Sequence, residues 1–169
     1  MTSKCNIEML TRYTAWANKR LLDKLVTLPL EVLSQPRPGR PNGIAGVLTH
    51  AYTVDLIWRA HLENKEHGFK SRNLEQPLSL AQLRSAQAVI DQWYVNYADA
   101  QTESTLEQIV NFKFVDGGAG ALCRGDILLH VVNHKTYHRG YVADMLYECD
   151  SHPPVIDLPV FLRDVQPDA

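Results

Sequence analysis

Apolar side chains recur at helical spacing in four separate stretches of the chain, and this periodicity constrains the fold more than any other feature. In the first stretch, from about Ile7 to Leu28, the apolar positions are three or four residues apart and therefore share one face of an α-helix. Asn6 is expected to cap this helix, and Pro29 is expected to end it. Because an amphipathic helix must bury its apolar face against another element, the sequence predicts an all-α protein.

Three more long helices are expected after the first one. Ser79 and Gln82 stand three residues apart at the start of one of them, which is the spacing of a capping box and the clearest helix start in the chain. The three helices are expected from about Ile44 to Leu62, from the Ser79 cap to about Ala100, and from about Gly125 to Glu148.

The connections complete the predicted architecture. Residues 34–43 contain three prolines and two glycines and are expected to form a loop, whereas the alternating pattern of residues 109–115, followed by Asp116-Gly117, predicts a short hairpin. Residues 157–163 are expected to form a short C-terminal helix. The predicted fold is a four-helix bundle with one long crossover connection, a hairpin-like insert before the fourth helix, and a single domain over residues 1–169.

Composition excludes several classes of protein. Seventeen basic and nineteen acidic residues give a net charge of −2, so no electrostatic footprint for nucleic acid or an anionic membrane is expected. No apolar run approaches the roughly 18 residues of a membrane span, and no secretory signal is visible, so a cytoplasmic protein is expected. Three reduced thiols are also expected, because the cysteines are odd in number and form no C-x-x-C motif: Cys5, Cys123 and Cys149.

Histidine carries the strongest chemical signal. His130, His134 and His138 are spaced by four on the predicted last helix, and side chains four residues apart on a helix are neighbours. The rise of the helix separates His130 from His138 by about 12 Å, so both cannot bind one ion. Helical angle places His134 and His138 within the apolar stripe, with His130 on its shoulder beside Tyr137 and Tyr141. A metal site is therefore predicted to use His134 with His138.

A third ligand must come from another helix, and His50 is the best candidate. It is expected to share the inward face of its helix with Val47. His61 lies near the end of the same helix and is a poorer choice, while His67 and His152 lie in loop-like sequence where exposure to solvent is expected. The predicted ligand set is His50, His134 and His138. The alternative is that these histidines are hydrogen-bonded core residues.

Three imidazoles with an open fourth position are typical of catalytic rather than structural zinc sites. Such a site can activate a water molecule for hydrolysis or a thiol for attack on an electrophile. Imidazoles suit Zn, Ni, Fe or Cu, so the pattern predicts a divalent ion without naming it. Lys135 stands where an H-E-x-x-H metalloprotease has its glutamate, which excludes that mechanism. A non-enzymatic binding module stabilised by its metal is the alternative from another class.

Five polar side chains are expected to line the pocket or to hold a ligand imidazole through its second nitrogen. Two of them, His130 and Tyr141, are candidates for a catalytic role. The full set is Tyr13, Asn18, Asp55, His130 and Tyr141. Two alternatives stay open: Asp55 is equally expected as a surface or interhelical carboxylate, and Tyr13 lies on the stripe that builds the core.

Residues 13–22, 48–58 and 129–140 resemble, in this order, the DinB family of small helical metal-binding proteins. The resemblance implies a four-helix bundle, a homodimer, and a three-histidine site for a divalent metal, which carries over onto His50, His134 and His138. Related proteins are thiol S-transferases that use low-molecular-weight thiols, so a small-molecule substrate is implied. One departure is visible, because Tyr141 stands where the family usually has glutamine.

Overall fold

The computed structural model describes residues 3–165, which are mainly helical. The long helices are α1 (Lys4–Leu25), α3 (Gly43–Leu62), α4 (Leu80–Asp99) and α6 (Arg124–Tyr147). The shorter elements are helices α2 (Leu30–Ser34), α5 (Glu103–Leu106) and α7 (Leu158–Val165), and strands β1 (Ile109–Lys113) and β2 (Ala119–Cys123).

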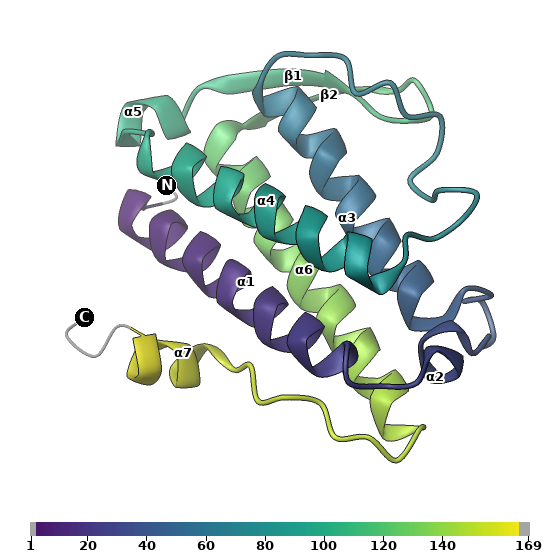
Figure 1. The fold of residues 1–169 in the computed structure, drawn as a ribbon. Coiled ribbons are helices and arrows are strands. Elements are labelled where there is room, and N and C mark those ends of the chain that lie inside the picture. Colours follow the sequence, from purple (N-terminus) through teal and green to yellow (C-terminus); the bar gives the residue numbers. More distant parts are fainter. Residues whose placement is uncertain (1–2, 166–169) are drawn as a thin grey trace.

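The four long helices pack side by side in the order α1, α4, α3, α6, with α6 also against α1 (Figure 1). Polar contacts show their directions. The Tyr97 hydroxyl donates to the Leu62 carbonyl at the ends of α4 and α3, so these two helices run the same way. The ion pairs of Arg12 with Asp99 and of Asp23 with Arg84 show that α1 runs opposite to α4. The chain therefore returns along the length of the helices between α3 and α4, through residues 63–79.

The expected long helices form, with ends that differ from the predicted ends by up to three residues. The capping box is confirmed, because the Gln82 amide donates to the Ser79 hydroxyl and the Ser79 amide donates to the Gln82 side chain. The prediction that Asn6 caps α1 was wrong, because α1 begins at Lys4. The Lys4 amide donates to a carboxylate oxygen of Glu103 on α5 at 3.0 Å. This tertiary contact satisfies the start of the helix, and local sequence does not reveal it.

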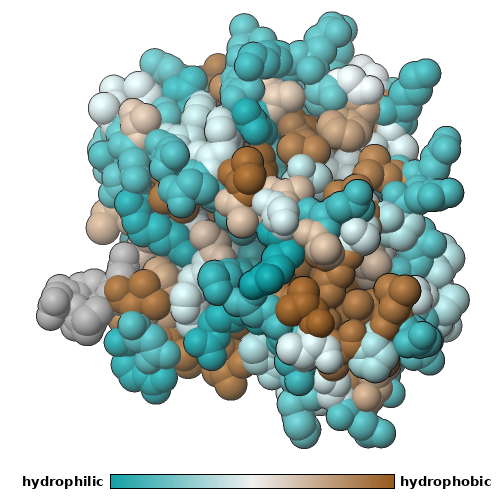
Figure 2. Space-filling model, in the orientation of Figure 1, coloured by the Kyte–Doolittle hydropathy of each residue, from teal (hydrophilic) through white to brown (hydrophobic). Residues whose placement is uncertain are grey.

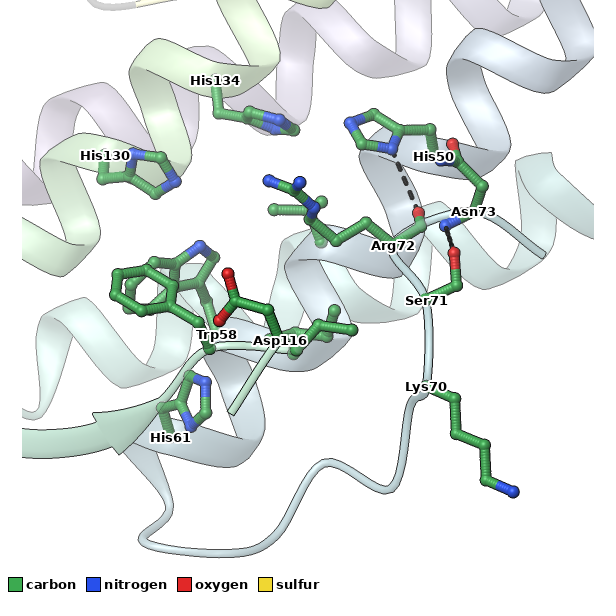
Figure 3. A pocket seen from close by; sticks show the side chains of 14 residues that line it. His50, Trp58, His61, Lys70, Ser71, Arg72, Asn73, Asp116, His130 and His134 are labelled. Carbon is green, nitrogen blue, oxygen red and sulfur yellow. Dashed lines mark hydrogen bonds between the residues drawn. The ribbon is translucent and has the colours of Figure 1, made fainter. Parts of the chain in front are cut away.

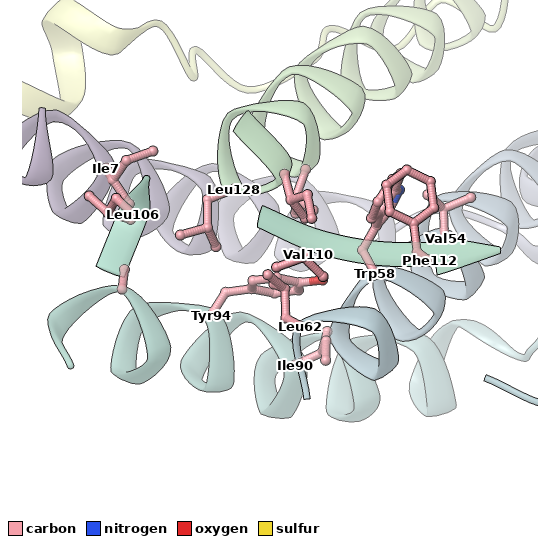
Figure 4. Close-up of a cluster of buried hydrophobic side chains, with 13 residues drawn as sticks. Ile7, Val54, Trp58, Leu62, Ile90, Tyr94, Leu106, Val110, Phe112 and Leu128 are labelled. Carbon is pink, nitrogen blue, oxygen red and sulfur yellow. The ribbon is translucent and has the colours of Figure 1, made fainter. Parts of the chain in front are cut away.

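The expectation of an all-α chain needs a correction, because the predicted hairpin forms a two-stranded antiparallel sheet. Alternate residues of β1 are buried, so that Val110 and Phe112 pack with side chains of α3, α4 and α6 (Figure 4). Gly120 lies opposite Phe112, where a Cβ atom would overlap the phenylalanine ring. The hairpin therefore covers one end of the long helices and places Phe112 against Trp58 on α3, at a ring distance of 4.9 Å.

The C-terminal helix α7 packs against α1. Phe161 is buried there between Tyr13 and Trp16, and the Tyr13 hydroxyl donates to the carbonyl of Ile156 at 2.9 Å. Tyr13, expected as a pocket residue, therefore anchors the C-terminal segment instead.

The surface mixes hydrophilic and hydrophobic side chains (Figure 2). The short helix α2 is an example of this mixture. It buries Leu33 and leaves Leu30 71% exposed. All three cysteines are free, as expected. Within residues 3–165, no helix combines the length and the hydropathy that a bilayer span requires.

Candidate metal centre

Three histidines from two helices meet in the structure. His50 comes from α3, and His134 and His138 come from successive turns of α6. One ring nitrogen of each lies within 4.8 Å of the ring nitrogens of the other two. These are the three residues that helical spacing and the family resemblance both indicate.

Hydrogen bonds show which ring nitrogens are free. The Nδ1 atom of His50 lies 3.0 Å from the backbone carbonyl of Arg72 and donates to it, which leaves the Nε2 lone pair available. The Nε2 atoms of His134 and His138 are 3.1 Å apart. Two nitrogens bound to one tetrahedral ion at ~2.0–2.1 Å would be separated by roughly 3.4 Å. The paired imidazoles are therefore close to the spacing that a shared ion requires.

Apart from this contact between their Nε2 atoms, the rings of His134 and His138 lack hydrogen-bond partners among the described residues. The Nδ1 atoms of His134 and His138 are buried, and neither has a hydrogen-bond partner within the described part of the chain. Buried polar groups in protein cores are nearly always hydrogen-bonded. The described protein groups therefore do not fully satisfy the cluster, and its three imidazole donors fit a metal ion.

Burial keeps the imidazoles neutral, which is the form that binds metal. Burial and the neighbouring His138 and His50 rings lower the pKa of His134 to about 3. Burial, then His50 and Lys135, lower the pKa of His138 to about 4. The pKa of His50 is also lowered, chiefly by burial.

A buried network of charges lies behind the cluster. Lys135 follows His134 in the sequence but turns into the space between the helices, where its ammonium lies 2.7 Å from a carboxylate oxygen of Asp55. The two side chains are only 5% and 1% exposed. The Lys135 ammonium also donates to the Gln87 side chain at 2.9 Å. Asp55 therefore links α3 to α6 and α4, which is the interhelical position expected as the alternative to the pocket.

Arg139, one turn after Lys135 on α6, also turns its charged group into the space between the helices. It is buried and donates to the Asn18 side chain of α1 at 3.0 Å. The Asn18 amide in turn donates to both carboxylate oxygens of Asp91 on α4, and the Gln87 amide donates to Asp91 at 2.7 Å. Asn18 was also expected at the pocket, and its interactions place it in this network. The signal for the network was present in the sequence, because Lys135 and Arg139 share the spacing of the two ligand histidines.

A cavity of about 440 Å³ opens beside His50 and His134 (Figure 3). His130 lines it, as expected for a residue at the pocket edge, with its ring 5.6 Å from that of His134. His61 was expected to have no special role, yet it is only 7% exposed, packs against Trp58 and lines the same cavity. The hairpin causes this burial, because Phe112 covers the end of α3.

The two loop histidines differ from each other. His152 is exposed, as expected. His67 is half-buried, because its Nδ1 atom accepts the backbone amide of Phe69 and its ring contacts that of His61. The expectation of a solvated side chain was therefore wrong for His67.

A second cavity, of about 470 Å³, lies on the other side of the cluster and is lined by His50, His138 and Arg40. The Arg40 guanidinium stacks on the Tyr141 ring at 4.0 Å. Tyr141 also shares a hydrogen bond with the hydroxyl of Tyr137. Tyr141 therefore supports the wall of the second cavity through Arg40. Because His50 lines both cavities, the histidine cluster stands at their junction.

Comparisons with known proteins agree with this arrangement. A family model described as "DinB family" matches residues 1–169. "Protein DinB" of Bacillus subtilis (strain 168) is 27% identical over 150 residues, which cover 81% of this chain and 82% of that protein. The crystal structure of a DinB-like protein from Bacillus cereus superposes with a TM-score of 0.66 at 20% identity, covering 85% of this chain and 91% of that one. At this identity the structural likeness shows the fold alone.

Proposed function

Because the chain belongs to the DinB family, we propose that it is a metal-dependent enzyme whose divalent ion is bound by His50, His134 and His138. The observation that carries the proposal is the convergence of three imidazoles where two cavities meet. Within residues 3–165, no fourth histidine, cysteine or carboxylate joins the cluster. Three protein ligands with room for another ligand are typical of catalytic zinc sites, whereas closed structural sites have four.

The protein's own groups would hold the site in place. The Arg72 carbonyl fixes the orientation of the His50 ring, and the Asp55–Lys135 pair joins α3 to α6, the helices that carry the three histidines. When bound, the ion would act as a Lewis acid that lowers the pKa of a thiol or water beside it. Zn, Ni and Fe all accept imidazole ligands, so the donor set supports a divalent metal of this group.

The two cavities favour transfer between two small molecules. His134 faces one cavity and His138 the other, so two ligands could approach the site from different sides. In a thiol S-transfer, a low-molecular-weight thiol loses its proton, its sulfur bonds to an electrophilic carbon, and the leaving group departs with its electron pair. Hydrolysis would need only one organic ligand and therefore only one of the cavities.

The remaining proposals follow from the sequence pattern and the family. We propose that the four long helices form a four-helix bundle, that residues 1–169 are one domain, and that the protein works as a cytoplasmic homodimer on small molecules. The near-neutral net charge of −2 supports no role in binding nucleic acid.

The metal content tests the ligand assignment. Untagged wild-type protein dialysed against a divalent metal is expected to retain about one ion per chain, and His134→Ala is expected to lose it, because two imidazoles bind far more weakly than three. Elemental analysis of the dialysed proteins measures the stoichiometry. His152→Ala is the matched control, because this histidine is exposed and lies outside the cluster. An unchanged stoichiometry in His134→Ala, with its circular dichroism intact, would contradict the assignment.

The reaction class is tested by conjugation. Metal-loaded wild-type protein is expected to join bacillithiol, mycothiol or glutathione to at least one member of an electrophile panel faster than the uncatalysed rate. His138→Ala should fall to that background, and His152→Ala should retain the activity. Equal conjugation by wild type and His138→Ala would exclude thiol transfer at the metal. Thiol-independent cleavage of an ester that is lost in His138→Ala would instead support a hydrolase.

A further inference from the structure

Arg72 has two separate relations to the site. Its backbone carbonyl accepts the hydrogen bond from His50, while its side chain belongs to the lining of the 440 Å³ cavity. Figure 3 shows the guanidinium reaching towards His134, whereas the ammonium of Lys70 points away from the cavity. Within the described residues, the Arg72 guanidinium forms no ion pair and no hydrogen bond. A free guanidinium therefore stands beside the candidate metal centre.

The one acidic side chain among the cavity lining does not pair with Arg72. The carboxylate of Asp116 accepts the backbone amide of Gly118 at 3.0 Å, within the turn of the hairpin, and makes no ion pair with Arg72. The charge of Arg72 is therefore available to a ligand. A guanidinium offers a planar fork of donors that matches a carboxylate in two parallel hydrogen bonds.

The other residues of the cavity lining indicate that the uncharged part of this ligand is apolar. Apolar side chains from α3 and the hairpin form its wall, among them Val54, Ile57, Trp58 and Phe114. A volume of about 440 Å³ lies in the range of small-molecule sites and is too small for a macromolecular segment. One free guanidinium suits a singly charged carboxylate better than a doubly charged phosphate, which would need further donors.

We propose that this cavity binds a small amphipathic carboxylate, with its charged group on Arg72 and its apolar body against Trp58 and Phe114. The inference rests on the proposed function, because it names the class of substrate that would reach the metal from this side. The two cavities also differ in the state of their arginine, since the second cavity presents Arg40, whose guanidinium stacks on Tyr141.

The experiment compares two probes of nearly the same shape, 3-phenylpropionate and its neutral analogue 3-phenylpropionamide. Isothermal titration calorimetry on the full chain, with and without metal, is expected to show about tenfold tighter binding of the carboxylate, from the charge-assisted hydrogen bonds. Arg72→Met should abolish the preference. Arg40→Met, an arginine beside the other cavity, should retain it. Asp116→Asn should increase it, because a negative charge in the same cavity is removed.

The outcomes separate this inference from the proposed function. Equal affinity of the wild type for both probes, or a preference that survives Arg72→Met and disappears in Arg40→Met, would overturn it. Metal content is measured on the same samples. If the carboxylate preference holds and the histidines bind no metal, only the proposed function fails. If the histidines bind metal and the protein shows no carboxylate preference, only the carboxylate site is excluded. Phe114→Ala should weaken both probes by a similar factor, and unchanged affinities would exclude the proposed position of the apolar body.

Discussion

Lys135→Met is expected to destabilise the folded protein by about 3–5 kcal/mol, because it leaves the carboxylate of Asp55 buried without its charged partner. The side chains of the pair are 5% and 1% exposed, so water cannot replace the lost interaction. Burial raises the pKa of Asp55, and the ammonium of Lys135 opposes this shift. Methionine keeps much of the length of the lysine side chain, which confines the change to charge and hydrogen bonding.

Chemical denaturation at neutral pH measures this loss against a matched substitution. Lys65→Met breaks the exposed pair with Glu63 and should cost less than about 1 kcal/mol. The double variant Asp55→Asn with Lys135→Met should recover part of the stability, since neither charge then remains buried alone. Equal costs for Lys135→Met and Lys65→Met would show that the buried pair contributes no more than a surface pair.

The buried network also explains how one helix serves two purposes. Along α6, His134 and His138 face the cavities, while Lys135 and Arg139, one residue later in each case, point between the helices. The pairs Lys135–Asp55 and Arg139–Asn18 connect α6 to α3 and to α1. They oppose rotation of α6 about its axis. The direction of the histidines is therefore set by contacts on the neighbouring face of the same helix, about 100° around its axis.

Much of the fold follows from local sequence. Helical periodicity predicts the long helices, and the Ser79 capping box predicts the start of α4, because both signals arise within a few residues. The start of α1 could not be predicted in this way, because the amide of Lys4 finds its acceptor in Glu103, almost a hundred residues later. Local patterns thus predict the elements, while their ends depend on tertiary contacts.

Part of the candidate site also follows from local sequence, and part depends on tertiary contacts. The spacing of His134 and His138, and the place of His50 on an apolar stripe, indicate the cluster that the structure brings together. Helical faces do not show which neighbouring helix a polar side chain meets, so the sequence could not decide between the pocket and the interhelical position in which Asp55 pairs with Lys135. His61 was missed because the hairpin that buries it comes from a distant part of the sequence.

Asp91→Asn is expected to change the way in which stability depends on pH. Burial raises the pKa of Asp91 from 3.8 to about 6, with Asp55 adding to the shift and Lys135 opposing it. Because the pKa is higher in the folded state, the carboxyl group contributes most to stability below pH 4, where it is protonated, and this contribution is lost as the pH rises through 6. A shift of this size corresponds to about 3 kcal/mol. Asparagine does not titrate, so the variant should gain up to about 3 kcal/mol relative to the wild type between pH 4 and pH 7.5.

Urea denaturation of both proteins across this pH range measures the difference in the free energy of unfolding. Asp23→Asn provides a control, because hydrogen bonds from Lys19 and Arg84 lower the pKa of that carboxyl below its ordinary value of 3.8. The contribution of Asp23 to stability is therefore lost only as the pH falls below about 4, so this variant should differ from the wild type by a nearly constant amount between pH 4 and pH 7.5. A pH profile for Asp91→Asn that is flat, or that follows the profile of Asp23→Asn, would show that the buried carboxyl is already ionised near its ordinary pKa and that the network around Lys135 compensates its burial in full.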